Sequence, residues 1–533
     1  MFVCVVTLLS LIISSSVSIN VLVFSPAFAH SHMNFMGHLA DTLTEAGHNV
    51  TFLVPIADEA RRNKLGVKIT KDIVIVEHDE VMKKEKVIVD DHMDMYWTTD
   101  LKSPNFEEDF KWFNEIMVQS CGNFLRNKDI VGEIRGRNID VAILEPLSIC
   151  GLGFFDKLGI KKTILASSCS LFDFILTHIG EPDDVSYVPS LISQSSDEMN
   201  ILDRYKNYKF SRDMATNMYK MFDDEMDVYR RYLGGDTPDW RHLLPSASLF
   251  FTNSNPYLDF PRPIIQKTVA IGGISVDMDK IKTTKLSDEW NEILDRREKN
   301  MLISFGSMVK SSGMPIQSRQ NILKAVKKHP DVTFIWKYET NETEWANGVD
   351  NIHFSTWVPQ TALLNDDRLS AFMTHGGLGS TNELAHTGRP AVVVPIFGDQ
   401  VRNAHMLSRQ NGAIFVWKEE LGNEKIVREA IHDILYNPIY TKHAKKLAEM
   451  LEKQPNKPKE LVVKHTEFVA KYGPFPQMDP YGRQLNWFQR TSIDIYLLIT
   501  ISHLIVIITI FYIFKYLLNI LPIRIVHRKP KSD

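Results

Sequence analysis

Short apolar runs alternate with helix-forming segments along the first half of the chain. The runs Val21–Phe24, Val50–Val54, Asp140–Leu144 and Thr163–Ala166 are short and largely apolar, which is typical of parallel strands buried on both faces. Between the first two lies Met33–Ala46, which has helical spacing and is followed by a glycine. This alternation predicts an α/β, Rossmann-like half.

The same alternation returns in the second half of the chain. Met301–Phe305, Val332–Trp336, Leu369–Met373 and Ala391–Pro395 are predicted strands, and Ile316–Lys328 is a predicted helix. Between these two series of strands, residues 175–240 of the N-terminal half are helical in pattern and rich in Met, Tyr and Phe. We therefore expect a duplication of the fold, with two Rossmann-like domains.

A glycine turn marks one strand end in the second half. Leu369–Met373 runs into Thr-His-Gly-Gly, with His375 and Gly377, and then into the helix-forming residues Asn382–His386. Such a turn exposes backbone N–H groups and the positive end of a helix at the carboxyl edge of the sheet, where phosphorylated ligands bind. The sequence therefore predicts a phosphate site around His375.

The chain is 533 residues long, which is too long for a single core. We expect a linker between the two domains at residues 268–284, where two glycines stand together. The predicted segments are residues 1–18 as a signal peptide, 19–275 as the N-terminal domain, 276–453 as the C-terminal domain, 454–492 as a Pro-rich return segment and linker, 493–516 as a transmembrane helix, and 517–533 as a basic cytosolic tail.

The two ends of the chain predict a membrane protein. Phe2–Ile13 is apolar and is followed by small polar residues, as in a signal peptide with cleavage near Ser18. Ile495–Phe514 has no charged residue and is long enough to cross a bilayer. Basic residues follow this stretch, which predicts a lumenal body. The last five residues, Lys-Pro-Lys-Ser-Asp, resemble an endoplasmic-reticulum retrieval signal, so we expect a single-pass protein of that membrane.

Composition limits the binding partners and the modifications that the sequence predicts. The net charge is −4 and there is no basic stripe, so nucleic acid is not an expected partner. Beyond the signal peptide the cysteines are Cys121, Cys150 and Cys169, which have no zinc-site spacing. A Cys121–Cys150 disulfide and buried free thiols both remain open. Asn49 and Asn341 begin glycosylation sequons; Asn341 lies in a polar loop, whereas Asn49 opens a strand and is expected to be buried.

The stretch from Trp357 to Gln400 carries a long, spaced pattern. It contains a Trp-x-Pro-Gln box, His-Gly-Gly with Glu383 eight positions after His375, and a closing Asp-Gln pair. This pattern resembles the UDP-glucuronosyltransferases, a branch of the family 1 UDP-glycosyltransferases with the GT-B fold. The resemblance implies that residues 19–275 bind the acceptor and residues 276–453 bind the UDP-sugar, with the two domains facing each other across a cleft.

The resemblance also implies roles for the residues of this stretch. Trp357 offers a flat face to the uracil, and Gln360 has both a donor and an acceptor for the uracil edge. Gly379 stands where many relatives have Asn, so Ser380 and nearby amides would have to replace that contact. The other expected contacts are those of Ser307, His375, Gly377 and Ser380 with the diphosphate, of Glu383 with the ribose, and of Asp399 and Gln400 with the hexose hydroxyls.

The catalytic base is expected in the N-terminal domain. The resemblance implies His32 as the base, with His30 as the neighbour that could be confused with it. A carboxylate that orients the imidazole makes it a better base. Many relatives have Asp at the strand end where this chain has Glu145, which is one methylene longer. A metal interpretation of the His-x-His pair lacks a third ligand.

The expected reaction is an inverting displacement that transfers a hexosyl group, with glucuronosyl as the expected sugar, from a UDP-sugar to hydroxyl or similar groups of small lipophilic acceptors. Such conjugation serves detoxification and needs the UDP-sugar as co-substrate, with no metal or other cofactor. Glucose transfer stays open, because no basic residue for a sugar carboxylate is evident. A non-catalytic UDP-sugar- or lipophile-binding membrane protein is the alternative of another class, and the retention of His32 and Glu145 argues against it. Homo- or hetero-oligomers are both possible.

Overall fold

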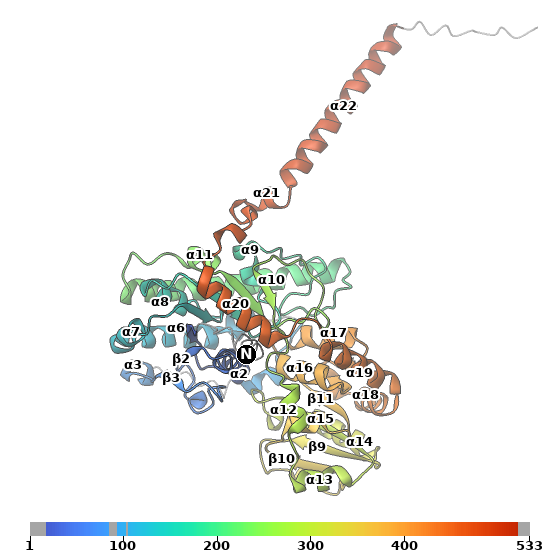
Figure 1. Cartoon of the computed structure of the whole chain (residues 1–533). Coiled ribbons are helices and arrows are strands. Elements are labelled where there is room, and N and C mark those ends of the chain that lie inside the picture. The colour runs from blue at the N-terminus through green and yellow to red at the C-terminus, as the bar shows by residue number, and fades with distance from the viewer. Residues whose placement is uncertain (1–17, 85–92, 103–104, 521–533) are drawn as a thin grey trace, which may run out of the picture. The chain divides into compact units, whose positions relative to one another are not determined.

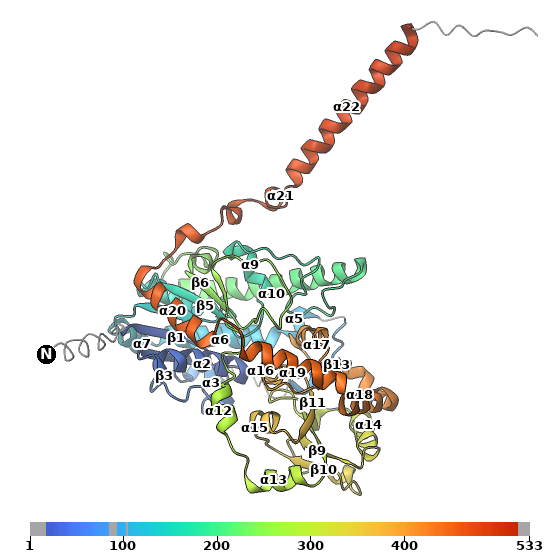
Figure 2. The same cartoon turned by 45° about the vertical axis from the view of Figure 1, so that its right-hand side comes forward.

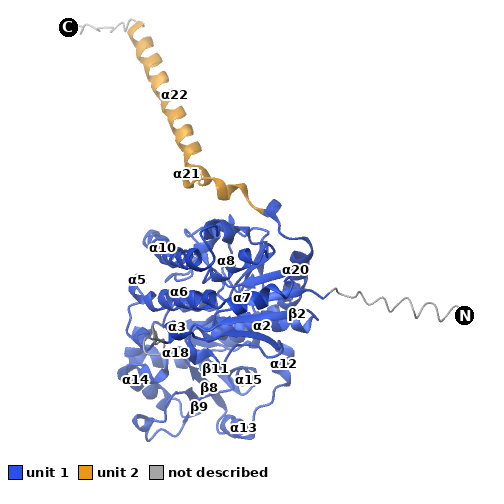
Figure 3. Ribbon diagram, turned by 90° about the vertical axis from the view of Figure 1, so that its left-hand side faces the viewer, with its two compact units in different colours: residues 1–478 blue, residues 479–533 orange. Residues whose placement is uncertain are grey.

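The structure is a computed structural model that describes residues 18–84, 93–102 and 105–520. The predicted signal peptide, except Ser18, lies outside the described residues, and so does the part of the predicted tail beyond residue 520, which includes the retrieval signal. The described chain forms two compact units, residues 1–478 and 479–533, drawn in two colours in Figure 3.

The first sheet has seven strands in the order β3-β2-β1-β4-β5-β6-β7, and every neighbouring pair is parallel. Most residues of its central strands are buried, which explains their continuous apolar runs. The strands are β1 (Asn20–Phe24), β2 (Asn49–Pro55), β3 (Asp72–Val76), β4 (Val141–Leu144), β5 (Thr163–Ser167), β6 (Leu249–Thr252) and β7 (Thr268–Ala270).

The second sheet has six parallel strands in the order β10-β9-β8-β11-β12-β13. The strands are β8 (Lys299–Ser304), β9 (Val332–Lys337), β10 (Ile352–Ser355), β11 (Leu369–Thr374), β12 (Ala391–Val393) and β13 (Ala413–Phe415). The predicted α/β class and the two Rossmann-type sheets are thus confirmed. We call the two sheets with their helices the first and second lobes; Figure 1 shows the first lobe in the upper part of this unit.

Each sheet reverses its strand order once. In the first sheet the chain moves outward from β1 in one direction and returns to β4 on the other side, and in the second sheet β8 and β11 have the same relation. In open parallel sheets, ligands bind at the carboxyl ends of the two strands that flank this reversal. The segments that follow β1, β4, β8 and β11 are therefore where a site is expected.

Helices cover both sheets. In the first lobe they are α2 (His30–Glu45), α3 (Glu80–Lys84), α5 (Phe106–Asp109), α6 (Lys111–Arg126), α7 (Lys128–Arg135), α8 (Cys150–Lys157), α9 (Asp173–Ile179), α10 (Ile201–Tyr232) and α11 (Trp240–Leu243). From α12 onwards they are α12 (Met278–Thr283), α13 (Asp288–Asp295), α14 (Ile316–Lys327), α15 (Gln360–Asn365), α16 (Leu378–Thr387), α17 (Gln400–Arg409), α18 (Glu424–Tyr436), α19 (Pro438–Glu452) and α20 (Pro458–Tyr472).

Two details differ from the sequence prediction. Helix α2 begins at His30 rather than near Met33, so His32 lies in its first turn. The expected linker at 268–284 begins with β7, the edge strand of the first sheet, and continues into α12. A three-residue strand is too short to show a periodic pattern in the sequence. The sequence therefore could not distinguish β7 from a linker.

The chain crosses between the lobes twice. The first crossing follows β7, the last strand of the first sheet, and the second lies between α19 and α20, where α20 returns to the first lobe. Val462 and Val469 of α20 are buried in the same hydrophobic cluster as β1 and β2, and α20 contacts α2 (Figure 2). At the second crossing, Oε1 of Gln454 accepts a hydrogen bond at 3.0 Å from Nδ2 of Asn255, which lies between β6 and β7, and both side chains are buried.

The second unit contains α21 (Trp487–Arg490) and the long apolar helix α22 (Ile493–Ile520). Helix α22 is long and apolar enough to cross a membrane. It is therefore a candidate span, and it covers the predicted one at 493–516.

Candidate active site

Two predicted residues meet at the carboxyl edge of the first sheet. His32 follows β1 and Glu145 follows β4, and Nδ1 of His32 lies 2.9 Å from Oε2 of Glu145. Ser168, after β5, joins them: its Oγ lies 2.7 Å from the same Nδ1, and its backbone N–H donates to Oε1 of Glu145 at 2.8 Å. Because Nδ1 faces Glu145 and Ser168, Nε2 is the nitrogen left for a reacting group.

The sequence analysis missed Ser168. It lies in a run of serines that has no motif spacing, and only the fold brings it beside His32. The loop around it is held tightly: Nδ2 of Asn253 donates to the Ser168 carbonyl at 2.8 Å, and Oγ of Ser167 donates to the Cys169 carbonyl at 2.7 Å. The position of Ser168 is therefore set by backbone contacts that no sequence pattern reveals.

The His375 ring is enclosed by two glycines. A Cβ added at Gly377 would lie 2.6 Å from its Nε2, and one added at Gly306 would lie 2.6 Å from its Cε1. Gly306, after β8, also has a positive φ of 88°, which favours glycine. Ser307, the next residue, is exposed. Burial, and then the charge of Lys337, lowers the pKa of His375 to about 4, so its imidazole is neutral at physiological pH.

A polar cluster joins α15 to α16. Nε2 of Gln360 donates to Oε2 of Glu383 at 2.6 Å and to Oγ of Ser380 at 3.0 Å, and the Thr361 hydroxyl donates to Oε1 of Glu383. Burial raises the pKa of Glu383. The structure thus brings three predicted residues together, whereas the Trp357 side chain stands apart with 68% of its surface exposed.

Asp399 and Gln400 form the start of α17. Asp399 precedes the helix, and Asn403 one turn later donates from Nδ2 to Oδ2 of Asp399 at 2.9 Å and to the Gly376 carbonyl at 3.0 Å. Asn403 therefore joins this helix start to the glycine turn, a link that the sequence analysis missed. Gln400 is buried, and its Oε1 accepts hydrogen bonds from two backbone amides of the preceding loop. Its carbonyl oxygen thus holds the loop.

Asp399 also connects the two lobes electrostatically. Burial raises the pKa of its carboxyl group, while the hydrogen bond from Asn403 and the charge of a protonated His32 lower it. His32 belongs to the first lobe and Asp399 to the second, so the edges of the two sheets face one another here. A ligand held by the second lobe at Asp399 would lie within reach of His32.

Comparison with known proteins identifies this arrangement. The sequence model of the family described as "UDP-glucoronosyl and UDP-glucosyl transferase" matches residues 20–529. The chain belongs to this family. It is 29% identical over 510 residues to the putative UDP-glucuronosyltransferase ugt-47 of Caenorhabditis briggsae, with 92% of this chain and 91% of the relative covered. It is 26% identical over 486 residues to UDP-glucuronosyltransferase 3A1 of Bos taurus, with 88% of each covered.

Solved structures show the same fold. A UDP-glucosyltransferase from Polygonum tinctorium superposes with a TM-score of 0.56 at 14% identity, covering 86% of this chain and all of that one. The glycosyltransferase VinC, solved with dTDP, superposes with a TM-score of 0.53 at 17% identity, covering 85% of this chain and all of that one. The transferase therefore has the predicted GT-B fold, and its family membership supports transfer of a glycosyl group from a UDP-sugar.

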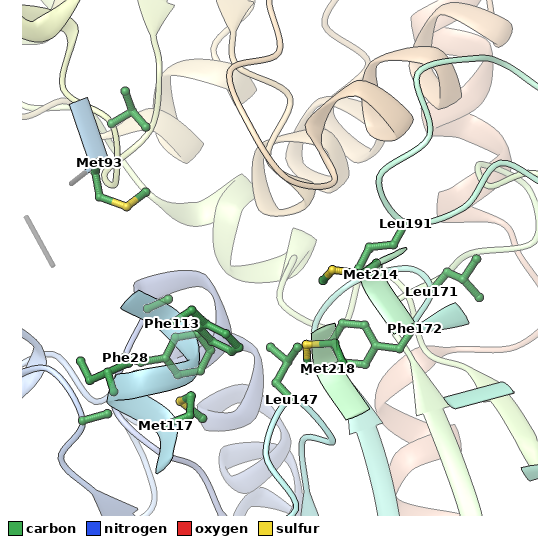
Figure 4. Close-up of a cluster of buried hydrophobic side chains, with 14 of the residues drawn as sticks. Phe28, Met93, Phe113, Met117, Leu147, Leu171, Phe172, Leu191, Met214 and Met218 are labelled. Atoms are coloured by element: carbon green, nitrogen blue, oxygen red, sulfur yellow. The ribbon is translucent and has the colours of Figure 1, made fainter. Parts of the chain in front are cut away.

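Buried apolar side chains of the first lobe form a cluster that includes Phe28, the neighbour of His32 (Figure 4). Phe28 precedes α2 and its ring centroid lies 4.7 Å from that of His32. Phe113 and Met117 of α6 lie beside Phe28, and Met214 and Met218 of α10 lie across from them. These aromatic and thioether groups form the apolar surroundings that a lipophilic acceptor would require.

A disulfide joins two of these elements. Cys121 of α6 and Cys150, the first residue of α8, are bonded with their Cα atoms 5.7 Å apart, and Cys169 is unpaired. The pairing that the sequence left open is therefore present.

In both sequons the asparagine is exposed. The expected burial of Asn49 is wrong, because it is the first residue of β2 and only the residues after it enter the core.

Among residues 18–84, 93–102 and 105–520, no three His, Cys, Asp or Glu side chains form a group suited to hold a metal ion. The first amides of α16 have no partner within the helix, and amides at such a helix start can bind phosphate groups. The neutral imidazole of His375 adds a hydrogen-bond donor at the same place.

We expect Gly377→Ala to weaken donor binding. The added methyl group would meet Nε2 of His375 at 2.6 Å and push the ring out of its place, although the backbone there is unstrained. Overpacking of this kind costs about 1–3 kcal/mol of stability, and we expect the KM for the UDP-sugar to rise about tenfold. The matched control is Gly379→Ala, two residues along, where a Cβ meets nothing within 4 Å. Equal donor KM values for both variants would contradict this role of Gly377.

Proposed function

We propose that the protein transfers a glucuronosyl group from UDP-glucuronate to a hydroxyl group of small lipophilic acceptors, with inversion at the anomeric carbon. The observation that carries this proposal is the His32–Glu145–Ser168 cluster of one lobe, which lies within electrostatic range of Asp399 in the other. The names of the relatives, at 25–29% identity, favour glucuronate as the donor sugar.

The proposed reaction is one displacement. The acceptor oxygen attacks the anomeric carbon of the sugar as the bond from that carbon to the β-phosphate oxygen breaks, and UDP leaves with the electron pair. Nε2 of His32 takes the acceptor proton. The Glu145 carboxylate holds Nδ1–H and stabilises the imidazolium that forms, as the carboxylate does in Ser-His-Asp systems. One displacement inverts the anomeric configuration.

The leaving diphosphate gains negative charge in the transition state. The first amides of α16, the imidazole N–H of His375, and the hydroxyls of Ser307 and Ser380 are proposed to stabilise it. Since the pKa of His375 is about 4, it acts as a neutral donor. Glu383 is proposed to accept from the ribose hydroxyls, and Trp357, which is exposed, to gain its packing partner when the uracil binds.

The remaining residues of the donor site are proposed to recognise the two ends of the UDP-sugar, the uracil and the hexose. Gln360 is proposed to reach the uracil edge, which requires its amide to give up one of its bonds to Glu383 or Ser380. Asp399 is proposed to accept from the hexose hydroxyls, and Gln400 to donate to them from its amide nitrogen. The UDP-sugar enters as co-substrate, and no resident cofactor takes part in the proposed steps.

We further propose a single-pass protein of the endoplasmic reticulum membrane, with the lobes in the lumen and a cytosolic tail. Helix α22 supports the anchor. The Cys121–Cys150 disulfide supports an oxidising compartment, and the exposed Asn341 and Asn49 are proposed to carry glycans there.

The test uses the full chain in microsomes, opened with a mild detergent. UDP-glucuronate and UDP-glucose are supplied separately with a panel of phenols and sterols, and the conjugates are measured by mass spectrometry. We expect glucuronides, and higher activity after opening the vesicles. Preferential use of UDP-glucose would overturn the donor assignment and leave glycosyl transfer standing. No conjugate with either donor would contradict the proposed function.

A further inference from the structure

One buried cation near the site has no part in the proposed reaction. Arg402 lies in α17, one turn after Asp399, and its side chain is fully buried. It forms an ion pair with Asp259, at 2.8 Å between Nη1 and Oδ1, and its guanidinium lies over the Phe260 ring at 5.2 Å. Burial of a charged group is costly even when it is paired, so such a group often serves specificity or geometry rather than stability.

The other contacts of Arg402 cross to the first lobe. Its Nη1 donates to Oγ of Ser170 at 2.6 Å, and its Nε donates to the Pro189 carbonyl at 3.0 Å. Ser170 is two residues after Ser168 in the loop that follows β5. One guanidinium therefore connects the helix start that carries Asp399 to the loop that carries the hydroxyl partner of His32.

This loop has little freedom to absorb a displacement. The carbonyl of Ser168 accepts from Asn253, whose Oδ1 in turn accepts from Nδ2 of Asn382 in α16, at 3.3 Å. The Ser168 amide is bound to Glu145. A shift at Ser170 would therefore be passed to Ser168, and from there to the orientation of the His32 ring.

We propose that Arg402 is a positioning residue that sets the place of His32 relative to the donor sugar. This inference rests on the proposed function, since it assumes that His32 is the base and that Asp399 holds the sugar. Arg402 touches neither reactant. It acts through Ser170 and the loop to Ser168, so it controls the alignment of base, acceptor oxygen and anomeric carbon.

Helix α17 also provides a control for the alternative that Arg402 only holds the two lobes together. Arg409, two turns after Arg402, also crosses to the first lobe, where its Nε pairs with Asp197 at 3.0 Å, and it also lies over Phe260, at 5.8 Å. Unlike Arg402, it is partly exposed and has no contact with the loop of Ser168 and Ser170. If Arg402 only held the lobes together, the two arginines would have similar effects.

The experiment compares Arg402→Gln, Ser170→Ala and Arg409→Gln in the full chain. It measures kcat and both KM values, the Kd for UDP by titration calorimetry, and the Tm. Misplacement by about 1 Å costs about 100-fold in rate, so we expect a fall of that size in kcat for Arg402→Gln. The lost hydrogen bond in Ser170→Ala should lower kcat about tenfold. The Kd for UDP should stay within about threefold of wild type, which marks an effect on alignment and not on donor affinity.

The double variant Arg402→Gln/Ser170→Ala should be no slower than Arg402→Gln alone, because the two residues act through one contact. Arg409→Gln should retain kcat within about twofold. Wild-type kcat in Ser170→Ala, or equal losses in the Arg402 and Arg409 variants, would overturn the proposal. If Arg402→Gln does not fold, Ser170→Ala decides alone, since it removes one hydroxyl. Turnover by the wild type tests the proposed function, whereas the ratio of variant to wild-type kcat tests Arg402, so each can fail separately.

Discussion

Replacing His32 by alanine should lower kcat about 1000-fold, within the range of about 100- to 10,000-fold that a general base contributes. The reason is that His32 is the proposed base, and its Nδ1 is held by the Glu145 carboxylate and the Ser168 hydroxyl, which leaves Nε2 to take the acceptor proton. The Kd for UDP should not change, because the proposed donor contacts lie in the second lobe. Steady-state kinetics with a phenolic acceptor and calorimetry with UDP measure the two quantities.

The control for this prediction is His30→Ala. His30 begins the same helix two residues earlier, and burial and the nearby charges of Arg61, Lys64 and Lys68 lower its pKa. We expect its variant to keep most of the wild-type kcat. A large loss in His30→Ala together with an active His32→Ala enzyme would transfer the role of base to the neighbour.

Replacing Asp399 by alanine should raise the KM for the UDP-sugar about 10- to 100-fold. A hydrogen bond to a charged group contributes about 1.5–3 kcal/mol, and Asp399 is proposed to make such bonds to the sugar hydroxyls. The loss also releases Asn403 from one of its two bonds, which loosens the link to the glycine turn. Initial rates over a range of donor concentrations, at saturating acceptor, give the KM.

The control for Asp399 is Asp367→Ala. Asp367 is an almost fully exposed carboxylate of the same lobe, paired with Arg389. Its variant should keep the donor KM of the wild type. If Asp399→Ala showed an unchanged donor KM, Asp399 would have no contact with the sugar, and the place of the hexose would have to be sought elsewhere.

Much of this architecture follows from the sequence. The central strands are buried on both faces, so they stand out as continuous apolar runs. The order of the motifs along the chain places His32 and Glu145 at neighbouring strand ends. Their contact could be expected, because the carboxyl ends of adjacent parallel strands share one edge of a sheet. The glycine turn around His375 could be predicted in the same way, because it directly follows an apolar strand.

The rest of the site depends on tertiary contacts that have no local signature. Ser168 is one of several adjacent serines, and nothing in its neighbours distinguishes the one beside His32. Gly306 has no space for a side chain because the His375 ring, 69 residues further along the chain, lies against it. This constraint cannot be predicted from the residues near Gly306 in the sequence. Arg402 gave no signal either, because an arginine on a helix is usually solvated and the burial of this one depends on tertiary contacts with Asp259, Ser170 and Pro189.

Asn255 joins the two places where the polypeptide passes from one lobe to the other, because its Nδ2 donates to the Gly272 carbonyl just after β7 and to Oε1 of Gln454 after α19. Two backbone crossings that are linked in this way favour a hinge motion. The lobes can rotate about the line of the crossings, but they cannot slide freely past each other. Helix α20, which precedes α22 in the chain, is packed in the first lobe. A membrane tether at α22 would therefore restrain the first lobe, and the second lobe would move as each UDP departs.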